Sequence, residues 1–148
     1  VSTLLTFGAM RRTPKTQQSA PMTPCASLRC AFGTRLAQKG TVHATIAECR
    51  MEIDQARLLV LSAAHAMDAH GNKAARQAIA MIKVVAPRIG CLVADRAIQI
   101  HGGAGYMAEY PIERLLRDCR VHQILEGTNE IMRVIVARHL LNTEEELR

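Results

Sequence analysis

Aromatic side chains are scarce in this sequence. Its 148 residues include two Tyr, two Phe and no Trp. A core without large rings must be filled by Ala, Ile, Leu, Val and Met, which favours closely packed helices. Apolar residues still make up 49% of the chain, which is typical of a globular protein and excludes a disordered one. No apolar run approaches the roughly 18 residues of a membrane span, so we expect none.

The cysteines and histidines lack the spacings of a disulfide framework or a metal site. The five cysteines are odd in number, irregularly spaced and without a C-x-x-C pair. The six histidines show no ligand spacing either. We therefore expect no metal and a reducing compartment.

Acidic residues are absent from the first 40 positions, which carry six basic ones. Residues 41–148 carry thirteen residues of each sign, so the net charge of +6 belongs to the N-terminal segment alone. A basic segment can bind nucleic acid or an acidic membrane. Because no aromatics are interleaved with these charges and no helix has a basic face, we expect no nucleic-acid partner.

Residues 1–28 read as an irregular basic N-terminal segment. Pro14, Pro21 and Pro24 interrupt it, Ser and Thr are frequent, and no periodicity is visible. One interpretation is a mitochondrial transit peptide, because the segment contains Arg, Ser and Thr and no acid. The other is a linker, or sequence foreign to the domain behind it. The domain itself is expected to occupy residues 29–148.

Apolar residues recur at alternating steps of three and four in two long stretches, 42–70 and 73–100. This period predicts two helices, with Gly71 ending the first and Pro87 interrupting the second. Their short connection predicts an antiparallel hairpin. Further helices are predicted from Pro111 and from Thr128. With no convincing strand, the fold class is all-α, an antiparallel helical bundle.

The segment 103–108, GAGYMA, fits the dinucleotide-binding pattern G-x-G-x-x-A. That pattern needs a preceding strand, whereas a helical seam precedes it here, so a Rossmann site is excluded. Three glycines in four positions, 102, 103 and 105, also exclude a helix at this point. A tight interhelical turn explains two of them, and a third glycine can let the backbone approach a ligand.

Glu126 lies just before the last predicted helix, in the stretch EGTN. Such a carboxylate is commonly a partner of the helix dipole. It is also suitably placed for a general base, because Gly127 would admit a substrate and Thr128 or Asn129 can cap the helix. The local pattern leaves both interpretations open.

Several motifs, taken in order, resemble a known family. They are RCAFG at 29–33, AIQIHGGAGYMAEYPIERLLRDCRVHQILEGTNEIMRVIVARHLL at 97–141, and the two helical seams between them. Together they resemble the C-terminal helical domain of acyl-CoA dehydrogenases. The resemblance implies an FAD-dependent enzyme that converts an acyl-CoA thioester to its trans-2-enoyl-CoA, with Glu126 as the catalytic base. Some branches lack an acid at this position, and this sequence keeps it.

The resemblance also implies cofactor contacts. Arg29 and Phe32 match residues that contact the FAD pyrophosphate and nearby groups. Gln99, Gly102 and Gly103 match contacts on the adenine side. In the family these come from the neighbouring subunit, so the resemblance implies a homo-oligomer, a dimer or a tetramer, and explains the third glycine by a nucleotide at the interface.

Further roles carry over from the last motif. Thr128 and Glu130 match residues that touch FAD in their own subunit, and Gly127 lies beside the substrate. His101 is interpreted as a packing residue. The family implies an acyl-CoA substrate, electron-transfer flavoprotein as the electron acceptor, and a location in mitochondria or the bacterial cytoplasm.

The sequence also departs from the family. The N-terminal helical and middle β domains are not matched, and the first bundle helix is expected to be missing or replaced. A bundle without that helix would expose an apolar groove. We therefore expect a C-terminal fragment that is inactive alone. The alternatives are a non-enzymatic helical module that associates with a full-length acyl-CoA dehydrogenase subunit, and an acyl-CoA oxidase.

Overall fold

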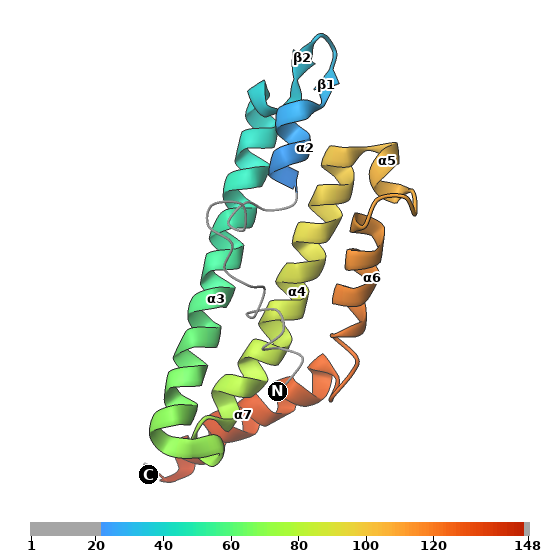
Figure 1. Ribbon diagram of the computed structural model, residues 1–148. Helices are drawn as coiled ribbons and strands as arrows, with labels where there is room; N and C mark the ends of the chain where they lie inside the picture. Colours follow the sequence, from blue (N-terminus) through green and yellow to red (C-terminus); the bar gives the residue numbers. More distant parts are fainter. Residues whose placement is uncertain (1–21, 147–148) are drawn as a thin grey trace.

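The structure is a computed structural model that describes residues 22–146, with side chains to residue 142. The two interpretations of residues 1–21 thus concern positions outside the described residues. The described elements are helices with one small hairpin (Figure 1). They follow in the order α2 (Met22–Leu28), β1 (Cys30–Ala31), β2 (Thr34–Arg35), 3₁₀ turn η1 (Leu36–Gln38), α3 (Gly40–Ala74), α4 (Arg76–His101), α5 (Gly103–Tyr106), α6 (Ile112–Val121) and α7 (Asn129–Glu146).

The predicted antiparallel hairpin is formed by α3 and α4, which run side by side (Figure 1). The backbone leaves helical geometry at Gly71, where φ is 78° and ψ is 175°. The first helix therefore ends where the sequence predicts. The second begins at Arg76, three residues later than predicted, because Ala75 still belongs to the connection.

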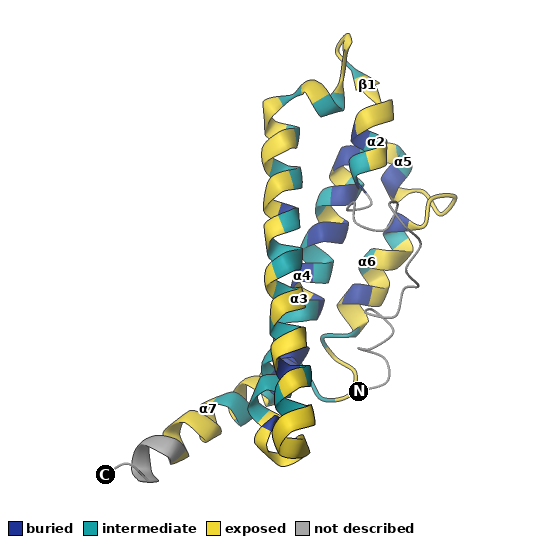
Figure 2. Ribbon diagram, turned by 60° about the vertical axis from the view of Figure 1, so that its left-hand side comes forward, coloured by how far each residue is buried: buried dark blue, intermediate teal, exposed yellow. Residues whose placement is uncertain are grey.

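The core is centred on α4, whose buried residues outnumber those of any other described helix (Figure 2). Ile89, Val93, Ala97 and Ile100 follow the predicted seam and pack in one cluster. Pro87 is buried inside this helix. This helix is also long and apolar enough to cross a membrane. That is weak evidence for a membrane span, because the core helix of a helical bundle has the same length and composition.

Residues 22–28 correct the prediction of an irregular segment. They form α2, with Met22 fully buried and Ala26 1% exposed in the main core cluster. Pro24 does not prevent this helix because it lies in the first turn, where backbone N–H groups have no helical partner. This helix of seven residues is too short to show an apolar period, so the burial of Met22 and Ala26 could not be predicted from the sequence.

RCAFG also contains strands, which the sequence analysis did not predict. Cys30 pairs with Arg35, and Ala31 with Thr34, in a two-stranded antiparallel hairpin. Phe32 and Gly33 form its turn, with φ of 56° and 76°. Two residues of positive φ are characteristic of the tight turns that join such strands.

The glycine-rich segment is a correction of the same kind, since residues 103–106 form the single helical turn α5. Gly105 is buried, and a β carbon there would lie 2.8 Å from His101 Cβ and 2.9 Å from the Ile98 carbonyl oxygen. Packing within the chain therefore explains this glycine without a nucleotide. His101 packs as predicted. Its Nδ1 lies 2.8 Å from the Ala97 carbonyl oxygen, and its ring makes an edge-on contact with the Tyr110 ring.

We predict that Gly105→Ala lowers the free energy of unfolding by about 1–3 kcal/mol, because the added β carbon would meet His101 Cβ and the Ile98 backbone, which cannot easily move. Gly103→Ala is the matched control, since a β carbon there meets nothing within 4 Å. Urea unfolding followed by circular dichroism measures both. Equal stability of the two variants would contradict the packing role.

The last helix, α7, crosses the lower part of α4 (Figure 1). Between α3, α4 and α7 runs an apolar groove of about 500 Å³. It is lined by Leu59, Met81, Val84, Val85, Arg133, Val136, Ala137 and Leu140. The described part of the chain thus contains a groove of the apolar kind that the sequence analysis anticipates.

Candidate functional site

Four predicted cofactor residues meet at the C-terminal end of α4. The Arg29 guanidinium donates a hydrogen bond of 2.6 Å to the Ile100 carbonyl. A β carbon at Gly102 would lie 2.6 Å from that guanidinium, so only glycine lets the arginine dock here. Gly103 follows, and the Gly102 N–H donates to the Gln99 carbonyl. We call these residues, Arg29, Gln99, Gly102 and Gly103, the Arg29 cluster.

Phe32 lies at the tip of the β1–β2 hairpin, which follows Arg29 in the sequence. Its side chain is 97% exposed, and the Lys39 ammonium lies over its ring, 5.5 Å from the ring centre. A non-glycine residue in the left-handed region is uncommon and strained. An exposed phenyl ring on a strained turn is not stabilised by the core of this chain. Its exposure favours a contact with another molecule.

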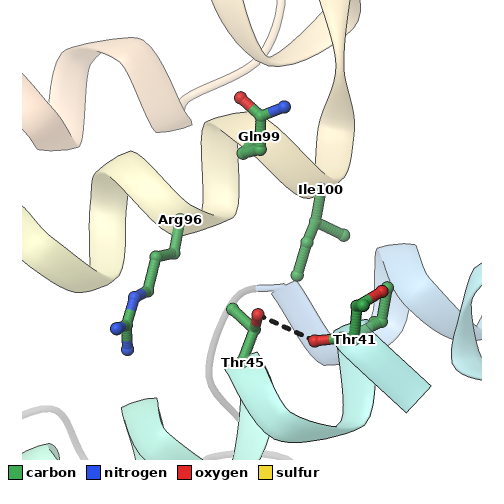
Figure 3. A pocket seen from close by; sticks show the side chains of 6 residues that line it. Thr41, Thr45, Arg96, Gln99 and Ile100 are labelled. Atoms are coloured by element: carbon green, nitrogen blue, oxygen red, sulfur yellow. Dashed lines mark hydrogen bonds between the residues drawn. The ribbon is translucent and has the colours of Figure 1, made fainter. Parts of the chain in front are cut away.

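A pocket of about 290 Å³ opens next to the Arg29 cluster, between the start of α3 and the end of α4 (Figure 3). Gln99 and Ile100 line it from α4, and Thr41 and Thr45 from α3. Arg96, also at its wall, forms an ion pair of 2.9 Å with Glu48. Two threonines and an ion-paired arginine thus lie at its wall, while most of its lining surface is apolar.

Glu126 lies in the loop between α6 and α7. Its φ is 56°, Gly127 follows with 96°, and its side chain is exposed in the single chain. The Asn129 N–H donates to the Gln123 carbonyl over 3.1 Å and closes the loop. We call residues 122–128 the Glu126 loop. Two successive left-handed residues make a sharp turn, which presents the carboxylate on the protein surface.

Thr128 and Glu130 form the start of α7. The Thr128 hydroxyl accepts a hydrogen bond from the Ile131 N–H at 3.4 Å, so Thr128 is the helix cap. The pKa of the Glu130 carboxyl lies below its usual value because its own backbone N–H and then the Thr128 hydroxyl donate to it. Arg133 adds an ion pair at 3.5 Å. Asn129 between them has a buried side-chain oxygen without a hydrogen-bond partner among the described residues.

The structure therefore divides the predicted site residues into two groups. The Arg29 cluster and Phe32 lie at one end of α4, and the Glu126 loop lies at the other (Figure 1). The contacts on α4 are Ile100 and Lys83, 17 residues apart, which is about 25 Å along a helix. Residues within each group are brought together, and the two groups are not.

Lys83 is a polar residue of this region that the sequence analysis did not single out. It is 6% exposed and donates a hydrogen bond to the His122 carbonyl in the Glu126 loop. Burial lowers the pKa of its ammonium, and the nearby Glu126 carboxylate acts in the opposite direction. The signal available was a lone lysine beside Ile82 and between Ile79 and Ala86 on the apolar side of a helix.

No group of three or more metal-ligating side chains occurs among the side chains that the structure describes, residues 22–142. The five cysteines are free thiols, with Cys49 and Cys119 buried. Burial raises the pKa of the Cys119 thiol, which keeps it protonated and unreactive.

Comparisons with known proteins agree with one another. Residues 22–141 match the family model described as "Acyl-CoA dehydrogenase, C-terminal domain". A probable acyl-CoA dehydrogenase of Mycobacterium tuberculosis is 50% identical over 117 residues, covering 79% of this chain and 29% of that protein. A putative acyl-CoA dehydrogenase structure from Mycobacterium abscessus superposes with a TM-score of 0.81 at 37% identity, covering 84% of this chain and 30% of that one.

Butyryl-CoA dehydrogenase of Megasphaera elsdenii is also similar, with a TM-score of 0.76 at 35% identity over 82% of this chain and 31% of that one. A helical domain with one small β-hairpin is thus the class that the fold defines. The chain belongs to the acyl-CoA dehydrogenase family and spans under a third of the length of these relatives.

Proposed function

We propose that this chain is the C-terminal helical domain of an FAD-dependent acyl-CoA dehydrogenase and supplies the catalytic base, Glu126. The observation that carries the proposal is the presentation of Glu126 on a sharp, left-handed turn tied to α4. The family match covers this turn and both helices that hold it. Alone, the chain is expected to be inactive, because it spans 29% of its M. tuberculosis relative.

The proposed reaction removes two hydrogens from neighbouring carbons of an acyl-CoA thioester. The Glu126 carboxylate takes the α proton, and Gly127 leaves room for the substrate beside the backbone. FAD, when bound, would accept the β hydrogen as a hydride. Because a C–H bond is a weak acid, the base must be held in position against it, and proton transfer by a positioned side chain contributes about 10²–10⁴ in rate.

The residues present fit an FAD. A similar solved structure is the FAD complex of PigA. In this chain, the Arg29 guanidinium suits a pyrophosphate, and the exposed Phe32 ring and the open space at Gly103 suit the approach of a flat nucleotide. At the other end, Thr128, Glu130 and the unpartnered oxygen of Asn129 offer polar contacts.

Because the two groups lie about 25 Å apart along α4, we infer that they serve two different flavins in a homo-oligomer, a dimer or a tetramer. Electron-transfer flavoprotein is the proposed electron acceptor, since a relative from Acetobacterium woodii is named as subunit CarC of a caffeyl-CoA reductase–Etf complex. Relatives occur in bacteria and mammals, in keeping with a bacterial cytoplasmic or mitochondrial location.

The test is a chimera in which residues 22–141 replace the matching domain of the M. elsdenii butyryl-CoA dehydrogenase, chosen because its name states its substrate. We expect a yellow protein that reduces a dye with butyryl-CoA, whereas the 148-residue chain alone is inactive. A chimera that retains FAD and shows no activity would contradict the proposal. Peroxide release in place of dye reduction would indicate an acyl-CoA oxidase.

We predict that Arg29→Ala weakens FAD binding to the chimera by about 10–100-fold, the effect of losing a hydrogen bond to a charged group. Equilibrium dialysis of the flavin measures the change. Arg88→Ala, at an exposed position on α4, is the control and should retain FAD. Unchanged affinity in Arg29→Ala would remove the arginine from the cofactor site.

The apolar groove favours a second candidate function, a non-enzymatic module that associates with a full-length acyl-CoA dehydrogenase subunit. A direct observation distinguishes the two functions. A colourless chain that co-purifies with a complete relative, and whose residues do not support activity in the chimera, would establish the second function.

A further inference from the structure

Lys83 is one of only two buried polar or charged residues within the described part of the chain. Lysine is almost never buried without a partner, because removing an ammonium from water is costly. Its side chain leaves the N-terminal part of α4 and reaches the Glu126 loop, 39 residues further along the sequence. The partners of this ammonium therefore explain why a charge is tolerated in the core.

The first partner is the end of α6. Lys83 Nζ donates to the carbonyl of His122, which is the C-cap of that helix. The last carbonyls of a helix have no partner within it and carry the negative end of the helix dipole. A buried cation at this point satisfies one of them and fixes where α6 ends and the loop begins.

The second partner is Glu126. Its carboxylate is close enough to act on the Lys83 ammonium, where it raises the pKa against the lowering effect of burial. The basic residues Arg120 and Arg133, on α6 and α7, act on Glu130. Glu126 is thus the acidic side chain whose charge acts on the Lys83 ammonium.

A neighbouring contact holds the same loop. Gln123 Nε2 donates to Cys91 Sγ over 3.2 Å, so α4 holds the loop at two points, eight residues or about 12 Å apart. The left-handed backbone of Glu126 is a strained conformation that persists only when its surroundings hold it. The two contacts supply that restraint on one side of the turn.

We propose that Lys83 is a positioning residue for Glu126. Its buried ammonium ties the loop that carries Glu126 to α4 through the His122 carbonyl. The catalytic meaning of this pair depends on the proposed function of Glu126, but the pair itself does not. Lys83 thus sets the position of the base without touching the substrate.

The test uses the full 148-residue chain and no cofactor. Carbon-13 NMR of labelled lysine follows the titration of Lys83, whose midpoint we expect to move to lower pH in Glu126→Gln, because the carboxylate that raises the pKa is gone. Glu109→Gln, an exposed acid before α6, is the matched control and leaves the midpoint unchanged. An unchanged midpoint in Glu126→Gln would overturn the pairing.

Hydrogen exchange gives the second measurement. Lys83→Met is expected to speed exchange of the Asn129 amide, which closes the loop, at least tenfold, while Lys83→Arg restores most of its protection. Lys73→Met, at an exposed lysine after Gly71, is the control. Equal exchange in Lys83→Met and wild type would overturn the proposal. Should Lys83→Met not fold, the Glu126→Gln titration still decides.

Neither measurement depends on activity. Failure of the chimera to oxidise butyryl-CoA would contradict the proposed function while leaving the Lys83–Glu126 pair intact. An active chimera together with an unresponsive Lys83 would contradict the positioning role alone.

Discussion

Glu126→Gln in the chimera is expected to lower turnover with butyryl-CoA by about 10²–10⁴, while FAD content stays the same. The amide has the shape of the carboxylate but cannot accept the α proton. Stopped-flow reduction of the flavin by butyryl-CoA measures proton abstraction directly, because hydride transfer requires the α proton to leave.

Two further variants sharpen this result. Glu126→Asp keeps the carboxylate on a side chain shorter by one methylene, so it should retain part of the activity. Glu109→Gln removes an exposed acid elsewhere and should be fully active. Turnover of Glu126→Gln within twofold of the parent chimera would show that another group is the base.

Met22→Ala is expected to lower the free energy of unfolding by about 2–5 kcal/mol. Met22 is fully buried although it is the first residue that the structure describes, and it packs in the cluster with Ile89, Val93 and Ile100. The substitution leaves a cavity between α2 and α4. Urea unfolding of the 148-residue chain, followed by circular dichroism, gives the change.

The control for this prediction is Met51→Ala, because Met51 lies on α3 and is 56% exposed. A change within about 0.5 kcal/mol is expected there. If the two methionine variants were equally stable, α2 would not belong to the core, and the domain would begin after it.

The sequence predicted the elements whose apolar period extends over many turns. The hairpin of α3 and α4 and the end of the first helix at Gly71 follow from that period and from one glycine. The family resemblance rests on motifs, and the comparisons confirm it. Long, periodic helices are the features that a single sequence states most plainly.

The wrong predictions concern elements that are too short to show a period, or residues whose contacts come from distant parts of the sequence. α2 has seven residues, too few to show a period, and its burial depends on α4. The strands of the hairpin have two residues each. The third glycine of the 102–105 segment is interpreted from the sequence as room for a ligand, whereas the backbone of Ile98, seven residues earlier, explains Gly105.

The candidate site shows the same division. Glu126, Arg29 and the glycines are visible as motifs, and whether they act as proposed is for the variants to decide. Lys83 belongs to no motif that was singled out, because its role depends on a carbonyl 39 residues further along the chain. Such a contact between residues far apart in the sequence can be recognised only in a three-dimensional structure.

A single helix, α4, connects the Arg29 cluster and the Glu126 loop. It contacts Arg29 through Ile100 and the loop through Lys83. Adding a single residue between these two anchor points would turn one by about 100° and shift it by about 1.5 Å relative to the other. Length variation is thus forbidden in this stretch of α4, whereas the exposed connection around Gly71 can tolerate it.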